Sequence, residues 1–413
     1  MDKIFQTMGG DPRNFNKLDL YKLPSPCFVI DKRALIDNLL TLNHLKSQTG
    51  VKILVALKAF STPYFGPLIS EYLDGCCSSG LYETKLAKKF FKGEISTFSP
   101  AYKKDDIREI VNLSDHIVFN SSNQLNDFYN ISMKFKNEIG LRINPLYSEI
   151  NNDKYDAASI NSRLGMHLND LNNIDINKLN GIHFHTLCEQ NFTPLENTWN
   201  KIKNDIVPIC KKLNWLNLGG GHHITRNDYE IGKLKNFLKQ IADETSCQIY
   251  IEPGEAVVLD SGILIGEIID SFKPSNELSP NIAVTDISAV SHIPDVIEAP
   301  YRPALLNEPK DGYKVMLGGP SCLAGDIIGE YNFKSIPKVG DRIAILDQAH
   351  YTMVKTSFFN GVKIPSVAIW DSDNDNLEVI KRFTYKDECQ IEEALKIAEK
   401  AGNDLKKQFE MDN

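Results

Sequence analysis

Short apolar runs recur along the first 260 residues, and most are followed by a longer stretch with helical spacing. Several runs are continuous β-branched or aromatic segments, which is typical of strands buried on both faces. Eight strands that alternate with helices over about 200 residues predict a parallel (β/α)8 barrel. A doubly wound sheet is the competing interpretation, because periodicity alone does not show closure. The runs lie at 51–57, 73–78, 94–99, 116–120, 139–144, 181–187, 214–218 and 248–252, with helix-like segments at 81–91, 103–112, 121–136 and 194–212.

The pattern changes after residue 260, where apolar runs are separated by turns that contain Pro and Gly. This pattern is typical of an antiparallel sheet. The last stretch, 388–409, has apolar positions at helical spacing and predicts a surface helix. We therefore expect a barrel domain over 29–260 and a β-sheet domain with a C-terminal helix, formed by 1–28 and 261–413. The later runs lie at 262–272, 281–289, 313–318, 341–347 and 364–370.

Composition narrows the class of protein. Of the 413 residues, 42% are hydrophobic and the net charge is −8, so the chain can bury real cores and a basic face for nucleic acid is not expected. No apolar run approaches the roughly 18 residues of a membrane span, and the N-terminus lacks the basic-then-apolar order of a signal peptide. The eight cysteines include no C-x-x-C pair, which indicates reduced thiols. We expect a cytoplasmic protein with neither nucleic-acid nor membrane partners.

Candidate chemical groups lie where the predicted barrel strands end, at the edge that carries function in such barrels. Lys58 closes the first run, and a buried lysine is costly unless it is paired, deprotonated or used covalently. Gly219, Gly220 and Gly221 follow the seventh run, where backbone N–H groups can bind a phosphate, and Glu252 ends the eighth. Together these are the parts of a pyridoxal 5′-phosphate site. The ordinary alternatives are a solvent-exposed lysine and a tight turn.

Two histidines alternate on the sixth run. His183 and His185 therefore face the same side of a strand. With His222 and His223 they could ligate a metal, but a metal site leaves Lys58 unexplained. We favour one histidine stacked on the cofactor ring and the other in a structural role, and we expect no metal.

The second region adds Cys322 and Tyr351 as candidates. Cys322 lies in the Gly- and Pro-containing loop 318–326, and a thiol that faces the cofactor can transfer a proton. Tyr351 could reach a phosphate or the substrate. Their ordinary interpretations are a small apolar residue and a packing aromatic ring.

Eight motifs in a fixed order carry a resemblance to a known family: ALKAFST (56–62), SSGLYETKL (78–86), HFHTLCEQNF (183–192), NLGGGHHITR (217–226), EPGEAVVL (252–259), HIPDVIEAPYRP (292–303), GGPSCLAGD (318–326) and AHYTMVKTSFFNG (349–361). The sequence resembles the fold-type III pyridoxal-phosphate decarboxylases, the alanine racemase-like barrel group that includes diaminopimelate and ornithine decarboxylases. Within this group it is most similar to the enzymes that decarboxylate carboxynorspermidine and carboxyspermidine. The resemblance covers nearly the whole chain, from about Pro24 to Asp371, and implies a role in polyamine biosynthesis.

The resemblance also implies roles for individual residues. Lys58 matches the lysine that forms a Schiff base with the cofactor, His185 the histidine stacked on its ring, and Glu252 the partner of the pyridinium nitrogen. Members of this group complete the site across a head-to-tail dimer, so the resemblance implies a homodimer in which the neighbouring subunit supplies the Cys322 loop. The further matches are Gly219, Gly220 and Gly221 for the phosphate, Arg163 and Tyr351 near the cofactor, and Cys322 as proton donor to the decarboxylated substrate.

Two departures from the wider group bear on the substrate. Relatives that bind a distal carboxylate carry arginine after E-P-G, whereas this chain has Glu255, which would repel a carboxylate and attract an amine. The residue after the loop cysteine is commonly acidic in relatives, but here it is Leu323, which suits a methylene chain. We assign Glu255 and Asp295 to the amines of a polyamine-like substrate. The ordinary interpretation of Asp295 is a loop or turn residue.

Three rival functions remain open at this point. One is another fold-type III activity, such as decarboxylation of diaminopimelate, ornithine or arginine, or racemisation; Glu255 and Leu323 argue against the diaminopimelate case. The second is a non-catalytic cofactor-binding protein, against which the region 260–413 and Cys322 argue. The third is a metal-dependent barrel hydrolase.

Overall fold

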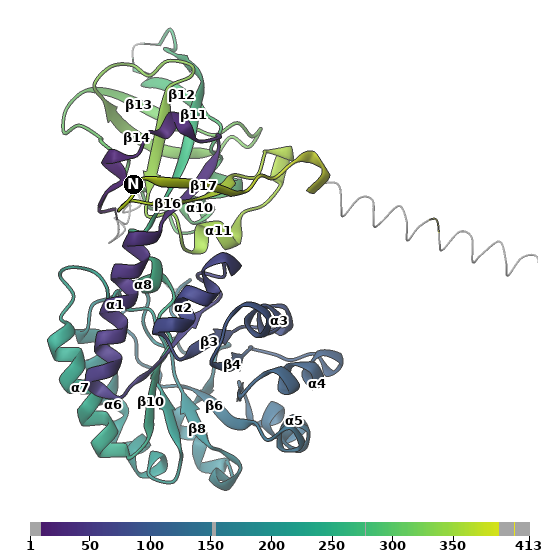
Figure 1. The fold of residues 1–413 in the computed structure, drawn as a ribbon. Helices are drawn as coiled ribbons and strands as arrows, with labels where there is room; N and C mark the ends of the chain where they lie inside the picture. The colour runs from purple at the N-terminus through teal and green to yellow at the C-terminus, as the bar shows by residue number, and fades with distance from the viewer. Residues whose placement is uncertain (1–9, 151–153, 277, 388–399, 401–413) are drawn as a thin grey trace, which may run out of the picture.

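The computed structural model of the chain describes residues 10–150, 154–276, 278–387 and residue 400. Figure 1 shows two sheets within this part of the chain, a barrel ringed by helices in the lower half and a second sheet in the upper half. Apart from residue 400, the helix predicted at 388–409 lies outside the described residues.

The barrel is a ring of parallel strands. Successive neighbours in the order β5-β4-β3-β2-β10-β9-β8-β6 are paired, and β5 and β6 pair with each other to close the ring. Closure shows that the doubly wound alternative is wrong. Each predicted run from 51 to 252 coincides with one of these strands to within a few residues. The strands are β2 (Lys52–Ala56), β3 (Gly75–Ser78), β4 (Glu94–Phe98), β5 (His116–Phe119), β6 (Glu138–Asn144), β8 (Gly181–His183), β9 (Trp215–Asn217) and β10 (Gln248–Ile251).

Helices form the outer layer of the barrel, and the four predicted helical segments coincide with α3 to α6. The stretch between β6 and β8 has no α-helix among its described residues; it holds the short strand β7 (Met166–His167) and the 3-10 turns Leu168–Asn173 and Ile176–Lys178. The helices are α1 (Lys32–Thr49), α2 (Gly66–Tyr72), α3 (Leu81–Phe90), α4 (Lys104–Leu113), α5 (Ser122–Phe135), α6 (Thr193–Cys210), α7 (Ile231–Thr245) and α8 (Glu255–Val258).

Trp215 fills the interior at the amino end of the strands. It is 2% exposed and lies against two glycines of neighbouring strands. A Cβ at Gly181 would lie 1.9 Å from the Trp215 ring, and one at Gly140 would lie 2.3 Å from it. The indole therefore occupies the space that those side chains would need, and the amino end of the barrel is packed solid.

The second sheet joins the N-terminal segment to strands that follow the barrel, in the order β14-β13-β12-β11-β1-β16-β17 with β15 on β11. Most neighbours are antiparallel, as predicted, but β1–β16 and β12–β13 are parallel. Both parallel pairs have long crossovers, the whole barrel in one case and the segment with α9 and α10 in the other, as parallel pairing requires. The strands are β1 (Cys27–Asp31), β11 (Gly262–Phe272), β12 (Asn281–Thr285), β13 (Tyr313–Gly318), β14 (Ile327–Phe333), β15 (Arg342–Leu346), β16 (Ser366–Asp371) and β17 (Asn376–Lys381).

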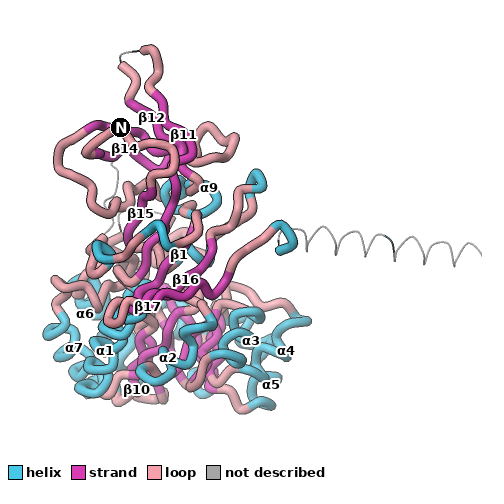
Figure 2. The backbone as a smooth tube through the Cα atoms, turned by 45° about the horizontal axis from the view of Figure 1, so that its top comes forward, coloured by secondary structure: helices cyan, strands magenta, loops and turns pink. Residues whose placement is uncertain are grey.

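Short helices connect the strands of the second sheet, and Figure 2 shows the strands of the two sheets as separate sets. β1 crosses the predicted boundary between residues 28 and 29, and the division of the chain into domains 29–260 and 1–28 with 261–413 stays a prediction. The helices are α9 (Ala289–His292), α10 (Asp295–Glu298) and α11 (Tyr351–Lys355), with 3-10 turns at Phe15–Lys17, Leu20–Lys22 and Phe359–Gly361; a further 3-10 turn, Pro63–Phe65, lies in the barrel between β2 and α2.

Candidate active site

Lys58 lies at the carboxyl end of the barrel, two residues beyond β2. Its backbone follows the buried Leu57, whose N–H donates to Cys77 O at 3.1 Å, while its own side chain is exposed. The Lys58 charge nevertheless acts on Glu252 and His185, whose pKa values it lowers. The lysine therefore faces the interior groups rather than bulk solvent alone.

Glu252 is a largely buried carboxylate at the end of β10. Its Oε1 accepts a hydrogen bond from Asn217 Nδ2 at 2.7 Å, and its Oε2 lies 3.4 Å from His183 Nε2. Burial opposes ionisation, but His183, the Asn217 amide and Lys58 outweigh it and lower the pKa of Glu252 to about 2. Burial lowers the pKa of His183 itself, so the carboxylate is ionised beside a neutral ring.

The glycine loop after β9 packs too closely for any side chain. A Cβ at Gly219 would lie 2.6 Å from Phe184 O, and one at Gly220 would lie 2.1 Å from Glu252 O. Gly219 and Gly221 also have φ values of 70° and 88°, in the left-handed region that glycine tolerates. Within the described chain, the Gly221 N–H donates to no protein group, so it can bind an anion.

His185 is fixed in orientation by this loop. The Gly220 N–H donates to His185 Nδ1 at 3.0 Å, which leaves the ring proton on Nε2. Burial, followed by the charges of Lys58 and Arg142, lowers its pKa well below the usual value. The ring is therefore neutral, as suits an imidazole that stacks on a flat cofactor.

Arg142 is a site residue that the sequence did not single out. It lies on β6, is 5% exposed, and its guanidinium carbon is 4.5 Å from the centre of the Phe98 ring. Burial lowers its pKa to about 10, against the attraction of Glu252, so it stays cationic at neutral pH. The sequence feature that could have indicated this residue is an arginine within the otherwise apolar segment 139–144.

Arg163, which the family resemblance selected instead, has an exposed side chain in the loop before β7. Its carbonyl accepts from Asn120 Nδ2 at 2.9 Å, and its guanidinium makes no hydrogen bond or ion pair with other described residues. Its role near the cofactor stays a prediction.

The second sheet contributes Tyr351, the first residue of α11. Its side chain is partly buried, and burial, followed by the charges of Glu255, Cys188 and Cys77, raises its pKa well above the usual value. Because Cys77 is the last residue but one of β3 and Glu255 begins α8, the tyrosine lies over the carboxyl end of the barrel.

Glu255 lies between two imidazoles. Its Oε2 is 3.4 Å from His223 Nε2 and its Oε1 is 3.5 Å from His350 Nε2. Burial opposes ionisation, but His350 and then His223 lower the pKa of Glu255 to about 2. The acid that follows E-P-G is therefore a buried, ionised carboxylate.

Asp295 already has partners in the chain. Lys355 Nζ lies 2.6 Å from its Oδ1, and Tyr155 donates to the same oxygen at 3.3 Å. Both Asp295 and Glu255 act on the Cys188 thiol and raise its pKa, so they face one region. Binding of a substrate amine by Asp295 would have to share the carboxylate with Lys355.

Cys322 is not brought to Lys58 within one chain. It is exposed, and its N–H donates to Asn360 Oδ1 at 2.9 Å. Asp326 accepts from the N–H groups of Ser321 (3.1 Å) and Ala289 (2.6 Å), which pins the loop. Leu323 beside it is 41% exposed. This loop has the form of a rigid, outward-facing element.

The comparisons with known proteins agree with this geometry. Residues 27–349 match the model of the family described as pyridoxal-dependent decarboxylase, C-terminal sheet domain. The chain belongs to the pyridoxal-dependent decarboxylases. Pyridoxal 5′-phosphate is accordingly its cofactor.

Relatives within this decarboxylase family cover almost the whole chain. The carboxynorspermidine/carboxyspermidine decarboxylase of Campylobacter jejuni is 38% identical over 380 residues, which are 89% of this chain and 98% of that protein. The carboxyaminopropylagmatine decarboxylase of a Synechocystis species is 34% identical over 89% of this chain and 95% of that protein. The crystal structure of carboxynorspermidine decarboxylase complexed with norspermidine from Campylobacter jejuni has a TM-score of 0.81 at 37% identity, covering 88% and 99% of the two chains.

The residues at the carboxyl end fit this decarboxylase cofactor. The Gly219–Gly221 loop leaves a cradle with a free N–H for the phosphate, Glu252 is ionised for the ring nitrogen, and Lys58 supplies an amine. In addition, His183 Nδ1 has no hydrogen-bond partner among the described residues, and its Nε2 has only the Glu252 carboxylate, at 3.4 Å. Polar groups at this end of the barrel thus lack partners within the chain, as expected of a site that binds a polar ligand.

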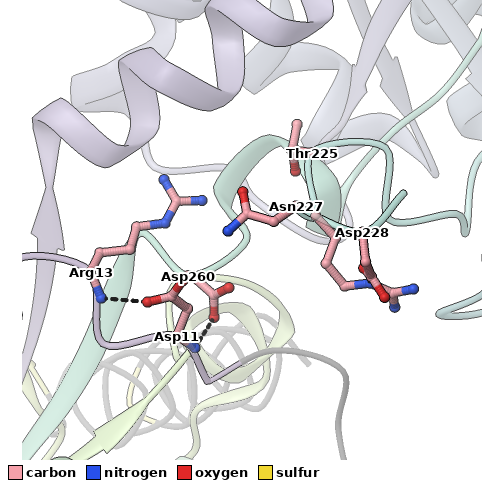
Figure 3. Close-up of a pocket in the computed structure, with 7 residues that line it drawn as sticks. Asp11, Arg13, Thr225, Asn227, Asp228 and Asp260 are labelled. Atoms are coloured by element: carbon pink, nitrogen blue, oxygen red, sulfur yellow. Dashed lines mark hydrogen bonds and ion pairs between the residues drawn. The ribbon is translucent and has the colours of Figure 1, made fainter. Parts of the chain in front are cut away.

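A separate cavity of about 310 Å3 lies elsewhere in the decarboxylase, between the N-terminal segment and the loop after β9. It is lined by none of the predicted site residues. Figure 3 shows Asp260 between its walls; Asp260 Oδ1 accepts from the N–H groups of Gly10 at 2.6 Å and Asp11 at 3.1 Å. Among the described residues no group of three or more His, Cys, Asp or Glu is arranged to hold a metal, and no helix is long and apolar enough to cross a membrane.

Proposed function

We propose that this chain decarboxylates carboxynorspermidine, carboxyspermidine or both, and so produces norspermidine or spermidine. The observation that carries the proposal is the ionised Glu255 at the site, where relatives that bind a distal carboxylate have arginine. A buried carboxylate favours an ammonium group of the substrate and repels a second carboxylate. The relatives that act on carboxylated polyamines support the same substrate class.

The cofactor, when bound, supplies an electron sink for the electron pair of the broken bond between Cα and the carboxylate. Lys58 would hold the cofactor through its amine. The ionised Glu252 would keep the ring nitrogen protonated, and the neutral His185 would pack on the ring face. Arg142 stays cationic and is stabilised by the charge of the Glu252 carboxylate.

A proton must replace the carboxylate that leaves as CO2. We assign this proton to Cys322, acting from the neighbouring subunit of a homodimer, because within its own chain the thiol is exposed and makes no contact with the described site residues. Glu255 receives an amine of the substrate, and Asp295 a second one in exchange with Lys355. Arg163 and Tyr351 bind the cofactor.

The test is CO2 release by the cofactor-loaded protein from carboxynorspermidine, carboxyspermidine, carboxyaminopropylagmatine, diaminopimelate, ornithine and arginine. We expect the highest kcat/KM with one of the first two substrates. Release from an amino acid of the last three, with none from a carboxylated polyamine, would contradict the proposal.

The shared site has its own test. Lys58→Ala and Cys322→Ala protein are each expected to be inactive, and mixing them should form heterodimers with one intact site. Random exchange then restores up to about one quarter of wild-type activity. No recovery after verified subunit exchange would show that Cys322 acts within its own chain or not at all.

We place the reaction in the cytoplasm. All seven described cysteines are free thiols, as in a reducing compartment.

A further inference from the structure

His350 links the barrel to the second sheet at Glu255. Its Nε2 lies 3.5 Å from Glu255 Oε1 and also 3.5 Å from Asp347 Oδ2. Glu255 begins α8 directly after the barrel strand β10, whereas Asp347 follows β15 of the second sheet. The side chains of His350 and Asp347 are only 12% and 7% exposed. One buried ring nitrogen is thus shared between an acid of each sheet.

The same histidine immediately precedes the helix that carries Tyr351. His350 is the N-cap of α11, yet its side chain makes no capping hydrogen bond. Its ring instead faces the two acids. Five residues further along, Lys355 of the same helix pairs with Asp295. The placement of the His350 ring therefore bears on α11 and both of its contacts to the site.

The groups around His350 carry more acid than base. Glu189 follows β8, His223 follows β9, Glu255 begins α8 and Asp347 lies on the loop of His350 itself. Burial lowers the pKa of His350, but Glu255 and then Asp347 outweigh burial and raise it to about 10. His223 has its pKa raised as well, by Glu255 above all, against burial. Among these groups three carboxyls face two imidazoles.

We propose that His350, as an imidazolium, is a positioning residue that holds the Glu255 carboxylate and the start of α11 in one arrangement. The inference rests on the proposed function, in which Glu255 receives an amine of the substrate. Without the cation, Glu255, Asp347 and Glu189 repel one another, and one of them takes up a proton. Burial and then Glu255 already raise the pKa of Glu189 to about 7, so Glu189 takes up the proton first, and the Glu255 carboxylate loses the cation that fixes its position for an ammonium group.

The kinetic test uses His350→Ala in the cofactor-loaded protein, with carboxynorspermidine as substrate. We expect KM to rise at least about tenfold, with a smaller loss of kcat, because a buried charge pair loses one partner. Added imidazole should refill the space with a cation and restore most of the KM. 1,2,4-Triazole, which has the same shape but stays neutral, should not.

His116→Gln is the matched control, since His116 is also a buried ring beside a glutamate, 3.8 Å from Glu94, but at the other end of the barrel. Its KM should stay within about twofold of wild type. An unchanged KM in His350→Ala, or equal rescue by triazole, overturns the proposal. If His350→Ala does not fold, His350→Gln takes its place and is expected to show the same rise in KM.

A second measurement does not depend on turnover. NMR spectra of protein with 13C-labelled histidine assign the His350 ring as the signal that disappears in His350→Gln. In the wild-type protein this signal should have the chemical shifts of an imidazolium at pH 8. In Glu255→Gln the same signal should move toward the neutral form. A neutral His350 at pH 8 refutes the inference even if the enzyme decarboxylates carboxynorspermidine. If His350 is charged but the protein does not decarboxylate carboxynorspermidine, the proposed function is wrong and the charge of His350 still stands.

Discussion

The two ends of the barrel interior carry similar residue types but differ in how far those residues satisfy one another. At the amino end, Lys52 pairs with Glu94, Tyr250 donates to the same carboxylate at 2.8 Å, and His116 stacks on Trp215 with ring centres 5.0 Å apart. At this end the lysine, the glutamate and the tyrosine pair with one another, whereas the Trp215 Nε1–H has no hydrogen-bond partner in the described chain.

The carboxyl end also holds a lysine, a glutamate and a histidine, but its polar groups are not saturated. His183 Nδ1 and Arg142 Nε make no hydrogen bond with the described chain, and Lys58 is exposed. Residue types alone therefore do not distinguish a site from a structural cluster. The pairing of the charged groups does differ: Lys52 is paired with Glu94 at the amino end, whereas at the carboxyl end Lys58 is exposed and the Arg142 Nε has no partner in the described chain.

The sharpest contrast between the two ends is between their lysines. Lys58→Ala should lower kcat/KM at least about 1,000-fold, because no amine is left to hold the cofactor. Lys52→Ala removes a partly exposed ion pair and should leave kcat within about twofold, with a stability loss of about 1 kcal/mol. CO2 release and the absorbance of the lysine-bound cofactor check both. A normally active Lys58→Ala variant would show that the cofactor assignment is wrong.

Substitution of Glu252 at the carboxyl end should likewise lower kcat far more than substitution of Glu94 at the amino end. Glu252→Gln replaces an ionised carboxylate by a neutral amide at the ring nitrogen, so kcat should fall by about 100-fold or more. Glu94→Gln keeps the hydrogen bond from Tyr250 and should change kcat little. Steady-state kinetics on the cofactor-loaded variants measure both values of kcat. An equal loss of kcat in the two variants would contradict the contrast between the two ends.

Trp215 tests the amino end for stability. Trp215→Ala should destabilise the protein by about 3–5 kcal/mol, because the ring leaves a cavity between Gly140 and Gly181. Urea unfolding followed by circular dichroism measures the loss. The fraction that stays folded should keep its kcat; a loss of activity without a loss of stability would mean that the amino end takes part in the reaction.

The smallest effect concerns pH. Burial lowers the pKa of His116 in the folded protein, so the unfolded chain binds its proton first. Stability is therefore complete above the unfolded value near pH 6.5 and falls as the pH drops below it. His116→Gln should lose part of this slope, by less than about 1 kcal/mol per pH unit, in urea titrations between pH 7 and pH 5. An unchanged slope would mean that the ring is charged in the folded state.

Much of the barrel and part of the site could be predicted because their signals are local. Each barrel strand is a short apolar run, and the chemistry falls at run ends, which placed Lys58, Gly219–Gly221 and Glu252 at one edge. Arg142 was missed because the segment 139–144 was considered only as a strand. Its inward-facing charge was visible in the sequence as the single ionised residue between apolar ones.

Contacts between segments far apart in the sequence could not be predicted, because no local pattern indicates them. The His350–Glu255 contact joins residues 95 positions apart on different sheets, and neither flanking sequence indicates the other. The parallel pairing of β1 with β16 likewise joins positions near 30 and near 370. Pairs of this kind are set by how the two sheets dock, which periodicity does not describe.

The position of β1 has a consequence for how the chain is made. This strand lies between β11 and β16, and both neighbours are synthesised long after it. While the ribosome produces the barrel, the apolar segment Cys27–Asp31 has neither of its partners. The barrel can close as soon as β10 emerges, but the central strand of the second sheet has to wait until residue 371 is outside the tunnel. Nascent chains that stop before β16 would therefore expose an apolar strand edge, which makes them natural clients for chaperones.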